Sequence, residues 1–238
     1  MAPLGTVRSL AARNTLLASL SSDAVRRLHA GIERVQVKAG QILCTPGMRM
    51  PYAYFPVRGV IALVAITAHG NTVQVAMVGP TGMVGPPTVL HDDVLPYQAV
   101  APVTLEAIRV PVSALVAELR TNPALQSRLL GHAHRHVTAM TRAAACYRFH
   151  TGVQRLCWWL LTASDGLQSD TVDVTHDLLA QLLGTTRTVI SAAASVLDED
   201  GLIRQRRGRV HILRRPQLCA RVCDCYDVPA QVAVQGLR

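Results

Sequence analysis

Apolar and polar residues follow two different rhythms along the chain, which divide it into a strand-rich part and helical parts. Between Ile32 and Val110, short alternating segments are separated by turn residues such as Gly40 and Gly59. Alternation with a period of two is typical of half-buried strands, and many short strands divided by turns indicate a sandwich or barrel. We therefore expect strands at residues 33–37, 60–66, 72–78 and 105–110.

Helical spacing dominates on both sides of this region. We expect helices at residues 14–30, 111–119, 153–163 and, after the Asn122-Pro123 pair, from 124 to about 147. In the long helix, apolar residues recur alternately three and four positions apart, which gives a seam for core packing or for a subunit interface. The seam consists of Leu130, Ala133, Val137, Met140, Ala144 and Tyr147.

Residues 173–213 have the pattern of two short helices followed by a hairpin. Thr175 is placed to cap the first helix, and Gly184 can adopt the left-handed conformation that ends it. Thr186 is placed to cap the second helix, and Gly201 to stop it. The apolar residues that we expect to face inward from the second helix are Val189, Ile190, Ala193, Val196 and Leu197.

The second helix and the hairpin carry side chains that suit DNA. A helix with Arg187, Thr188 and Ser191 near its start fits the major groove, where base edges show distinguishable donor and acceptor patterns. Six arginines then occur within twelve residues, which suits phosphates rather than bases: Arg204, Arg206, Arg207, Arg209, Arg214 and Arg215. The alternative is a core helix pair with a solvated basic face. The combined order and spacing favour DNA binding by Thr175, Thr186, Arg187, Thr188, Ser191, Arg204, Arg206, Arg207 and Arg209.

At these residues the segment resembles the winged helix-turn-helix of the Crp/Fnr family of bacterial transcription regulators. The matching pattern is Thr175, Leu179-Ala180, Leu183-Gly184, Arg187, Ile190-Ser191, Gly201-Leu202-Ile203 and Arg207-Gly208. Upstream, Tyr54-Phe55-Pro56 followed by Gly59-Val60-Ile61 resembles the cyclic-nucleotide-binding β-roll of the same family.

The resemblance implies an α+β protein with three parts: a jelly-roll-like β-roll sensor domain at 1–121, a dimerisation helix and hinge at 122–149, and a winged helix-turn-helix domain at 150–238. It implies a homodimer, paired through the long helix, that reads a pseudo-palindromic double-stranded DNA operator, with RNA polymerase as a candidate partner. Thr188, Ser191 and Ala192 replace residues that are frequent in the family, so we expect a different operator half-site.

The region that would hold a cyclic nucleotide departs from the family pattern. Members that bind the nucleotide use a Gly-Glu-Leu turn and an Arg-Ser or Arg-Thr pair, which supply amides, a carboxylate and an arginine. Here Pro86 stands in place of the carboxylate and also lacks an amide donor. The corresponding pocket residues are Gly82, Met83, Val84, Gly85, Tyr97 and Gln98. We expect weak or absent cyclic AMP binding, predict no cofactor and leave the effector unidentified.

The charge of the chain adds little to this interpretation. The formal net charge is +9, carried almost wholly by arginine, which favours bidentate pairing with phosphate and guanine. However, residues 147–238 hold 11 basic and 9 acidic side chains, whereas residues 1–146 hold 13 and 6. The local arginine cluster, and not the total charge, therefore supports DNA binding.

Two groups of potential metal ligands do not match a known metal motif. His132, His134 and His136 fall on the long helix, and the first and last share a face, yet two histidines make an incomplete site. We expect solvated or interfacial histidines and no metal.

Cys219, Cys223 and Cys225 form C-x-x-x-C-x-C without a second pair in the metal-site spacing. We favour reduced structural thiols. A thiol-based redox or metal-responsive protein remains an alternative, as does a ligand-independent DNA-binding factor with a degenerate sensor domain.

Catalysis and membrane insertion find no support in the sequence. There is no phosphate loop, nucleophile elbow or histidine–glutamate metal motif, so we predict no enzyme and no catalytic residues. No apolar run approaches the length that a membrane helix needs. We expect a cytoplasmic protein.

Overall fold

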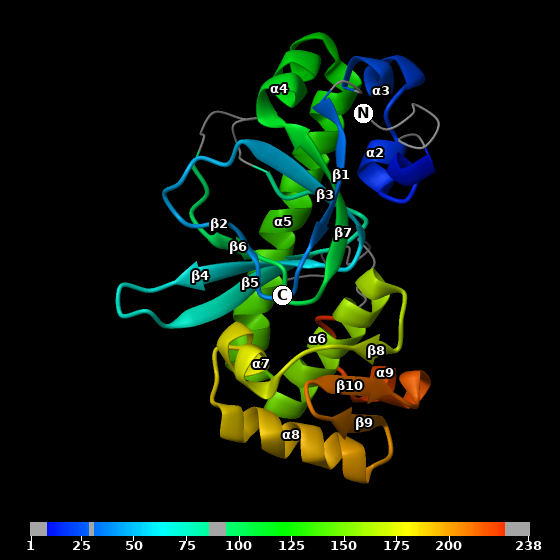
Figure 1. Ribbon diagram of the computed structural model, residues 1–238. Helices are drawn as coiled ribbons and strands as arrows, with labels where there is room; N and C mark the ends of the chain where they lie inside the picture. The colour runs from blue at the N-terminus through cyan, green and yellow to red at the C-terminus, as the bar shows by residue number, and fades with distance from the viewer. Residues whose placement is uncertain (1–8, 29–30, 86–93, 227–238) are drawn as a thin grey trace, which may run out of the picture.

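The computed structural model describes residues 9–28, 31–85 and 94–226. A β-roll forms one end of the molecule, and a helix-turn-helix with a small sheet forms the other (Figure 1). The expected α+β class is confirmed.

Two short helices lie at residues 15–28, where the sequence predicted one helix. Helix α2 spans Thr15–Ala18 and helix α3 spans Ser22–Leu28. The side chain of Asn14 accepts hydrogen bonds from the amides of Leu16 and Leu17, and Ser19 closes α2. The Ser21 hydroxyl then accepts from the amide of Ala24, so that a new helix starts after a break.

In the described residues, seven antiparallel strands build the β-roll as two sheets. Their order is β1-β7-β3 in one sheet and β2-β6-β4-β5 in the other. All four strands expected from alternation are present, and three others were missed. The strands are β1 Glu33–Val37, β2 Ile42–Cys44, β3 Tyr52–Arg58, β4 Ile61–Ile66, β5 Thr72–Val78, β6 Gln98–Val100 and β7 Leu105–Pro111.

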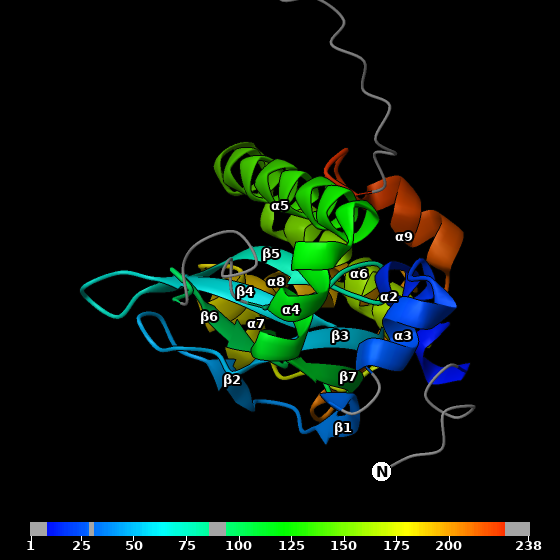
Figure 2. The ribbon, with the colours of Figure 1, turned by 90° about the horizontal axis from the view of Figure 1, so that it is seen from above.

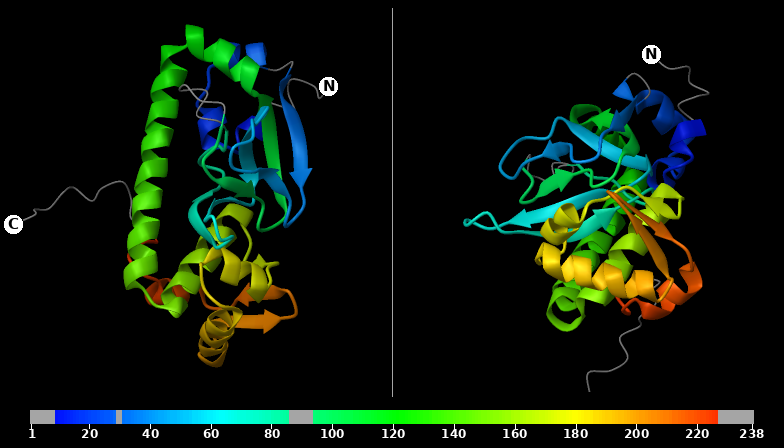
Figure 3. Two further views of the ribbon diagram at one scale, coloured as in Figure 1. Left: turned by 90° about the vertical axis from the view of Figure 1, so that its left-hand side faces the viewer. Right: turned by 60° about the horizontal axis from the view of Figure 1, so that its bottom comes forward.

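Three helices connect the β-roll to the other end of the molecule. They are α4 (Val112–Thr121), α5 (Pro123–Phe149) and α6 (Gly152–Leu167). The side chain of Asn122 caps α5 by accepting from the amide of Leu125. Helix α5 runs along one side of the whole molecule, from α4 at the top to α6 at the bottom (Figure 3, left). Helix α6 is longer than the predicted 153–163, because the helix ends only at Gln168, which adopts the left-handed conformation.

The last part of the chain is a winged helix-turn-helix. Its sheet has the order β8-β10-β9, in which Arg209–Ile212 of β10 pair with β9, and Val210 and His211 also pair with β8. The elements are β8 Thr171–Val172, α7 His176–Leu182, α8 Arg187–Glu199, β9 Ile203–Arg206, β10 Arg209–Ile212 and α9 Arg215–Arg221.

One apolar cluster joins the β-roll to the helix-turn-helix. Val60, which directly precedes β4, and Ala62 of β4 belong to the same buried cluster as Trp159 of α6 and Ile190 of α8. Seen from above, α5 lies over the β4–β5 side of the roll (Figure 2), in agreement with the contacts between α5 and β5. Burial of this cluster holds the winged helix-turn-helix against its own β-roll.

None of the helices in the described ranges is long and apolar enough to cross a membrane.

Candidate nucleic-acid interface

The two helices of the helix-turn-helix begin at the expected capping residues. The Thr175 hydroxyl accepts from the amide of Leu178 at 3.2 Å, and the Thr186 hydroxyl accepts from that of Val189 at 3.4 Å. Gly184 between the helices has φ +57°, where a side chain would be strained. These local features fix the angle at which α8 leaves α7.

Helix α8 buries one face and leaves the other open. Ile190, Ala193, Ala194 and Leu197 are buried. The expectation that Val189 and Val196 also face inward was wrong, because their side chains are 39% and 41% exposed. The two valines lie at the edges of the buried face and contribute to the exposed face of α8.

Arg187 stands at the first turn of α8 and points away from the core. Its side chain is 69% exposed and pairs with Asp177 of α7 at 3.3 Å. Thr188 is exposed beside it, and the Ser191 hydroxyl lies 3.0 Å from Nδ1 of His176. The ion pair holds the guanidinium at the open edge of the helix.

The hairpin β9–β10 forms a basic wing next to α8. It turns at Gly208, where φ is +70°. Arg209 pairs with Asp173, whereas Arg204, Arg206 and Arg207 are exposed and make no ion pair with other described residues. An open depression of about 430 Å³ is lined by Arg187 together with Arg206, Arg207 and Arg209. The start of α8 and the wing therefore border the same depression, which also includes Asp177.

The remaining arginines of the sequence cluster have different roles. Arg215 donates to the Ser164 hydroxyl at 2.9 Å and to the Tyr226 hydroxyl at 3.1 Å, and it pairs with Asp165. It therefore fastens α9 to α6, and the prediction that it serves DNA phosphates is not supported by this placement. Arg214 is exposed.

The turn that corresponds to the phosphate-binding turn of cyclic-nucleotide binders makes its hydrogen bonds within the chain. The amide of Gly82 donates to the carbonyl of Gly79 at 3.1 Å, and that of Val84 to the carbonyl of Tyr54 at 2.8 Å. The side chain of Asn14 donates to the carbonyl of Gly82, and Met83 is buried. Pro86 lies outside the described residues.

The other predicted pocket residues lie within the packed β-roll. A side chain at Gly85 would meet Ala53 at 2.9 Å, so the turn packs closely on β3. Tyr97 packs against the core of the roll, where burial raises the pKa of its hydroxyl, and Gln98 starts β6.

Comparison with known proteins agrees with both halves of this architecture. A family model described as a cyclic nucleotide-binding domain matches residues 34–122, and one described as a Crp-like helix-turn-helix domain matches residues 154–221. The chain belongs to the Crp/Fnr family of DNA-binding transcription regulators.

Individual relatives of this Crp/Fnr regulator are distant. The transcriptional regulator SdrP of Thermus thermophilus is 25% identical over 185 residues, which cover 76% of this chain and 90% of SdrP. The structure of FixK2 from Bradyrhizobium japonicum has a TM-score of 0.67 at 14% identity and covers 81% of this chain and 98% of its own. The c-di-GMP responsive regulator CLP of Xanthomonas campestris has a TM-score of 0.64 at 17% identity, with coverages of 81% and 99%. At these identities the two structures show a shared fold.

The apolar seam of α5 is divided between two faces in this Crp/Fnr chain. Leu130 and Val137 are 56% and 62% exposed. Met140 packs against the β-roll, and the Tyr147 hydroxyl donates to the carbonyl of Gln74 at 2.7 Å. Ala144 is exposed and Ala133 half-buried, so the outward part of the predicted interface is Leu130, Val137 and Ala144.

The histidines of α5 also differ in their surroundings. His134 is exposed, but His132 is buried with Nε2 2.9 Å from the carbonyl of Met83, contrary to the expected solvated site. Burial lowers the pKa of His132, and it lowers the pKa of the neighbouring His136 to about 4. Both rings are therefore neutral near pH 7, and the His132 ring lies against the turn at Gly82 and Met83.

The three C-terminal cysteines do not lie together. Cys219 is exposed on α9, whereas Cys223 and Cys225 lie beside Cys146 and His150 at the end of α5. A hydrogen bond between Cys146 and Cys223 lowers the pKa of the Cys223 thiol to about 6 and raises that of Cys146. The sequence reasoning missed Cys146 and His150. Their spacing of four residues at a helix end was the available signal.

Proposed function

We propose that this Crp/Fnr regulator binds a pseudo-palindromic operator as a homodimer and does not respond to cyclic AMP. In this proposal α8 lies in the major groove with Arg187 contacting a base, and the wing arginines contact phosphates on either side. Such a regulator acts on chromosomal DNA in the cytoplasm, with RNA polymerase as a candidate partner.

The observation that carries the proposal is the position of Arg187. Its exposed guanidinium stands at the start of α8 and borders the same depression as Arg206, Arg207 and Arg209. Arginine at the start of a recognition helix pairs most often with guanine, whereas hairpin arginines follow the backbone. Thr188 and Ser191 stand on the same helix, and Thr175 and Thr186 lie at the two helix starts that would approach phosphates.

Dimerisation is supported by the outward face of α5. Leu130 and Val137 are seven residues apart on a long helix, and both are largely exposed in the single chain. A two-fold pair of these helices would set the two α8 helices one DNA turn apart, about 34 Å, and would require a pseudo-palindromic site.

The absence of a cyclic AMP response is supported by the sensor turn. Amides of a phosphate cradle must be free to donate to the ligand. Here the amides of Gly82 and Val84 donate within the chain, and the buried Met83 lies between them. A phosphate would have to displace these contacts, and the sequence has Pro86 at the position where nucleotide-binding members have a carboxylate.

The proposal is tested with an operator obtained by selection from random duplexes. The change Arg187→Ala should weaken operator binding by about 1 to 3 kcal/mol and relax the preference at one base position. The change Arg207→Ala should weaken operator and random DNA alike and reduce the salt dependence of binding. Fluorescence anisotropy at several salt concentrations measures both effects.

The control is Arg26→Ala, which removes an exposed arginine of α3 far from the DNA-binding end and should leave binding unchanged. Cyclic AMP added to the wild-type protein should not alter its affinity. Equal losses on operator and random DNA for Arg187→Ala would contradict the assignment, and a rise in affinity with cyclic AMP would contradict the sensor part.

A further inference from the structure

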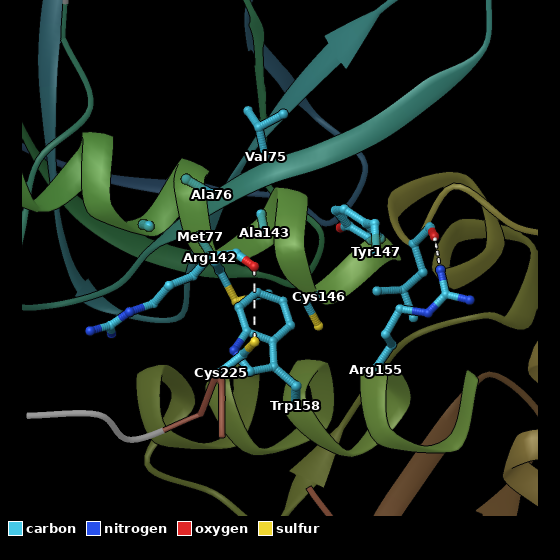
Figure 4. A pocket seen from close by; sticks show the side chains of 12 residues that line it. Val75, Ala76, Met77, Arg142, Ala143, Cys146, Tyr147, Arg155, Trp158 and Cys225 are labelled. Carbon is cyan, nitrogen blue, oxygen red and sulfur yellow. Dashed lines mark hydrogen bonds between the residues drawn. The ribbon is translucent and has the colours of Figure 1, made fainter. Parts of the chain in front are cut away.

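Four metal-ligating side chains meet at the junction between α5 and α6. Cys146 lies in the last turn of α5, and His150 follows as its C-terminal capping residue. The chain after α9 returns to the same place and brings Cys223 and Cys225. Figure 4 shows Cys146 and Cys225 beside Trp158, below α5. Residues from both ends of the winged helix-turn-helix therefore converge at one point.

The distances within this thiol cluster (Cys146, His150, Cys223 and Cys225) match a single metal ion. All four ligand atoms lie within 4.8 Å of one another. The sulfurs of Cys146 and Cys223 are 3.7 Å apart, and the sulfur of Cys225 is 3.5 Å from Nδ1 of His150. A tetrahedral ion with bonds of about 2.3 Å to sulfur and about 2.0–2.1 Å to nitrogen separates its ligands by about 3.5 to 3.8 Å.

The contact of the other nitrogen of His150 is a second, independent indication of a metal site. Its Nε2 lies 3.4 Å from a carboxylate oxygen of Asp224. Metal-binding histidines commonly donate their second N–H to a carboxylate, which fixes the ring orientation and strengthens the ligand. The ring is thus held with Nδ1 directed at the sulfur atoms.

We propose that Cys146, His150, Cys223 and Cys225 bind one Zn²⁺ ion through three thiolates and one imidazole. Three cysteines and one histidine form a closed donor set, which is typical of structural zinc and leaves no position for a substrate. Binding releases the thiol protons to solvent and changes no oxidation state. The proposal does not depend on DNA binding.

Two other uses of the cysteines fit the geometry less well. A disulfide needs its sulfurs at about 2.05 Å, so Cys146 and Cys223 would have to approach each other further. An iron–sulfur cluster places several iron atoms between its thiolates and would hold them further apart than a single ion does. The sulfur–sulfur spacing of 3.7 Å and the sulfur–nitrogen spacing of 3.5 Å therefore suit a single ion best.

The zinc would join the end of α5, which precedes the winged helix-turn-helix, to the segment that follows α9. Cys146 precedes this unit and Cys223 follows it, 77 positions along the chain. An ion bound only by the folded arrangement stabilises that arrangement by mass action. The site would therefore set how firmly the DNA-binding unit is held at the end of the dimerisation helix.

The first test measures the metal content of the full-length protein, purified under reducing conditions without chelators. Mass spectrometry of the elements should find one zinc per chain in the wild type and in Cys219→Ser, which changes an exposed cysteine outside the cluster. The double variant Cys223→Ser/Cys225→Ser should lose the zinc and unfold at a lower temperature. Zinc retained by the double variant would overturn the proposal.

The second test uses the wild-type protein alone, so it does not depend on whether a variant folds. After removal of metal under reductant, Co²⁺ should bind with one ion per chain and give the ligand-field bands of a tetrahedral thiolate site, which Zn²⁺ then displaces. The absence of these bands, an iron–sulfur chromophore in the purified protein, or a Cys146–Cys223 disulfide in place of metal would each refute the zinc site.

Discussion

Glu118 shows how a single buried charge is accommodated in this protein. The residue is 4% exposed, and both carboxylate oxygens accept hydrogen bonds from Arg27, at 2.6 and 2.7 Å. The side chain of Asn122 donates a third at 2.9 Å. The hydrogen bonds from Arg27, more than any other contact, hold the pKa of Glu118 below its usual value. The carboxylate thus ties α3 to the junction of α4 and α5.

This contact predicts how stability depends on pH. Because the pKa of Glu118 is lower in the folded chain than the value of about 4.3 expected when unfolded, its contribution is complete above that value and is lost as pH falls. The free energy of unfolding should therefore fall more steeply towards acid pH in the wild type than in Glu118→Gln. Urea titrations from pH 7 to pH 3 measure this difference, with the exposed Glu199→Gln as control. Parallel profiles for the wild type and Glu118→Gln would contradict the account.

Individual site residues were predictable only where the signal is local. Thr175, Thr186 and Gly184 were predicted in their capping and turn positions because such positions depend on a few consecutive residues. Cys146 and Cys223 were not predicted to meet, because only the folded chain brings positions 77 apart together. The prediction that Val189 faces inward was wrong, because apolar character alone does not show where the buried face of a helix ends.

At the scale of elements, the strands show where alternation is informative. The strands β1, β4, β5 and β7 carry a regular pattern and were predicted. The strands β2 and β6 are three residues each, too short for a pattern to be seen. Strand β3 contains Pro56, which argues against a central strand. Its position at the edge of the sheet, with a register shift near Pro56, accommodates the missing amide.

The outer face of α5 gives the prediction at this scale. A charge at Val137 should repel its counterpart across a two-fold axis and oppose burial of the helix face. We expect Val137→Asp to shift the protein from dimer to monomer and to weaken binding to the selected operator more than to a half-site. Analytical ultracentrifugation measures the first effect. The control Ile66→Asp changes an apolar side chain of β4 that is 41% exposed and should leave the dimer intact. Unchanged sedimentation of Val137→Asp would exclude this face from the interface.

At the scale of the whole molecule, β5 joins the two halves. The Tyr147 hydroxyl donates to the carbonyl of Gln74 in β5 at 2.7 Å, and it lies 3.4 Å from the carbonyl of Leu182 in α7. The indole N–H of Trp159 donates to the side chain of Gln74 at 3.2 Å. The Thr72 hydroxyl donates to the carbonyl of Gln181 at 3.1 Å. These contacts surround the shared apolar cluster with directed hydrogen bonds.

We therefore expect the β-roll and the winged helix-turn-helix to unfold together. Tryptophan fluorescence reports on the surroundings of α6, which carries both tryptophans of the sequence, Trp158 and Trp159, whereas circular dichroism reports on the whole chain. The two urea transitions should coincide. The change Tyr147→Phe should lower the free energy of unfolding by about 0.5 to 1.5 kcal/mol by both probes. Tyr52→Phe is the control, because the Tyr52 hydroxyl makes no hydrogen bond with other described residues. Two separate transitions would show independent domains.

The common core of Val60, Ala62, Trp159 and Ile190 also limits how the chain can be divided or recombined. Cutting the chain between α5 and α6 would leave the winged helix-turn-helix with an exposed apolar surface where β4 and β5 had covered it. Grafting that part onto the β-roll of another regulator would succeed only if the host presented strands of matching shape. We therefore expect a substitution in this shared core on one half to be tolerated only together with a compensating substitution on the other half.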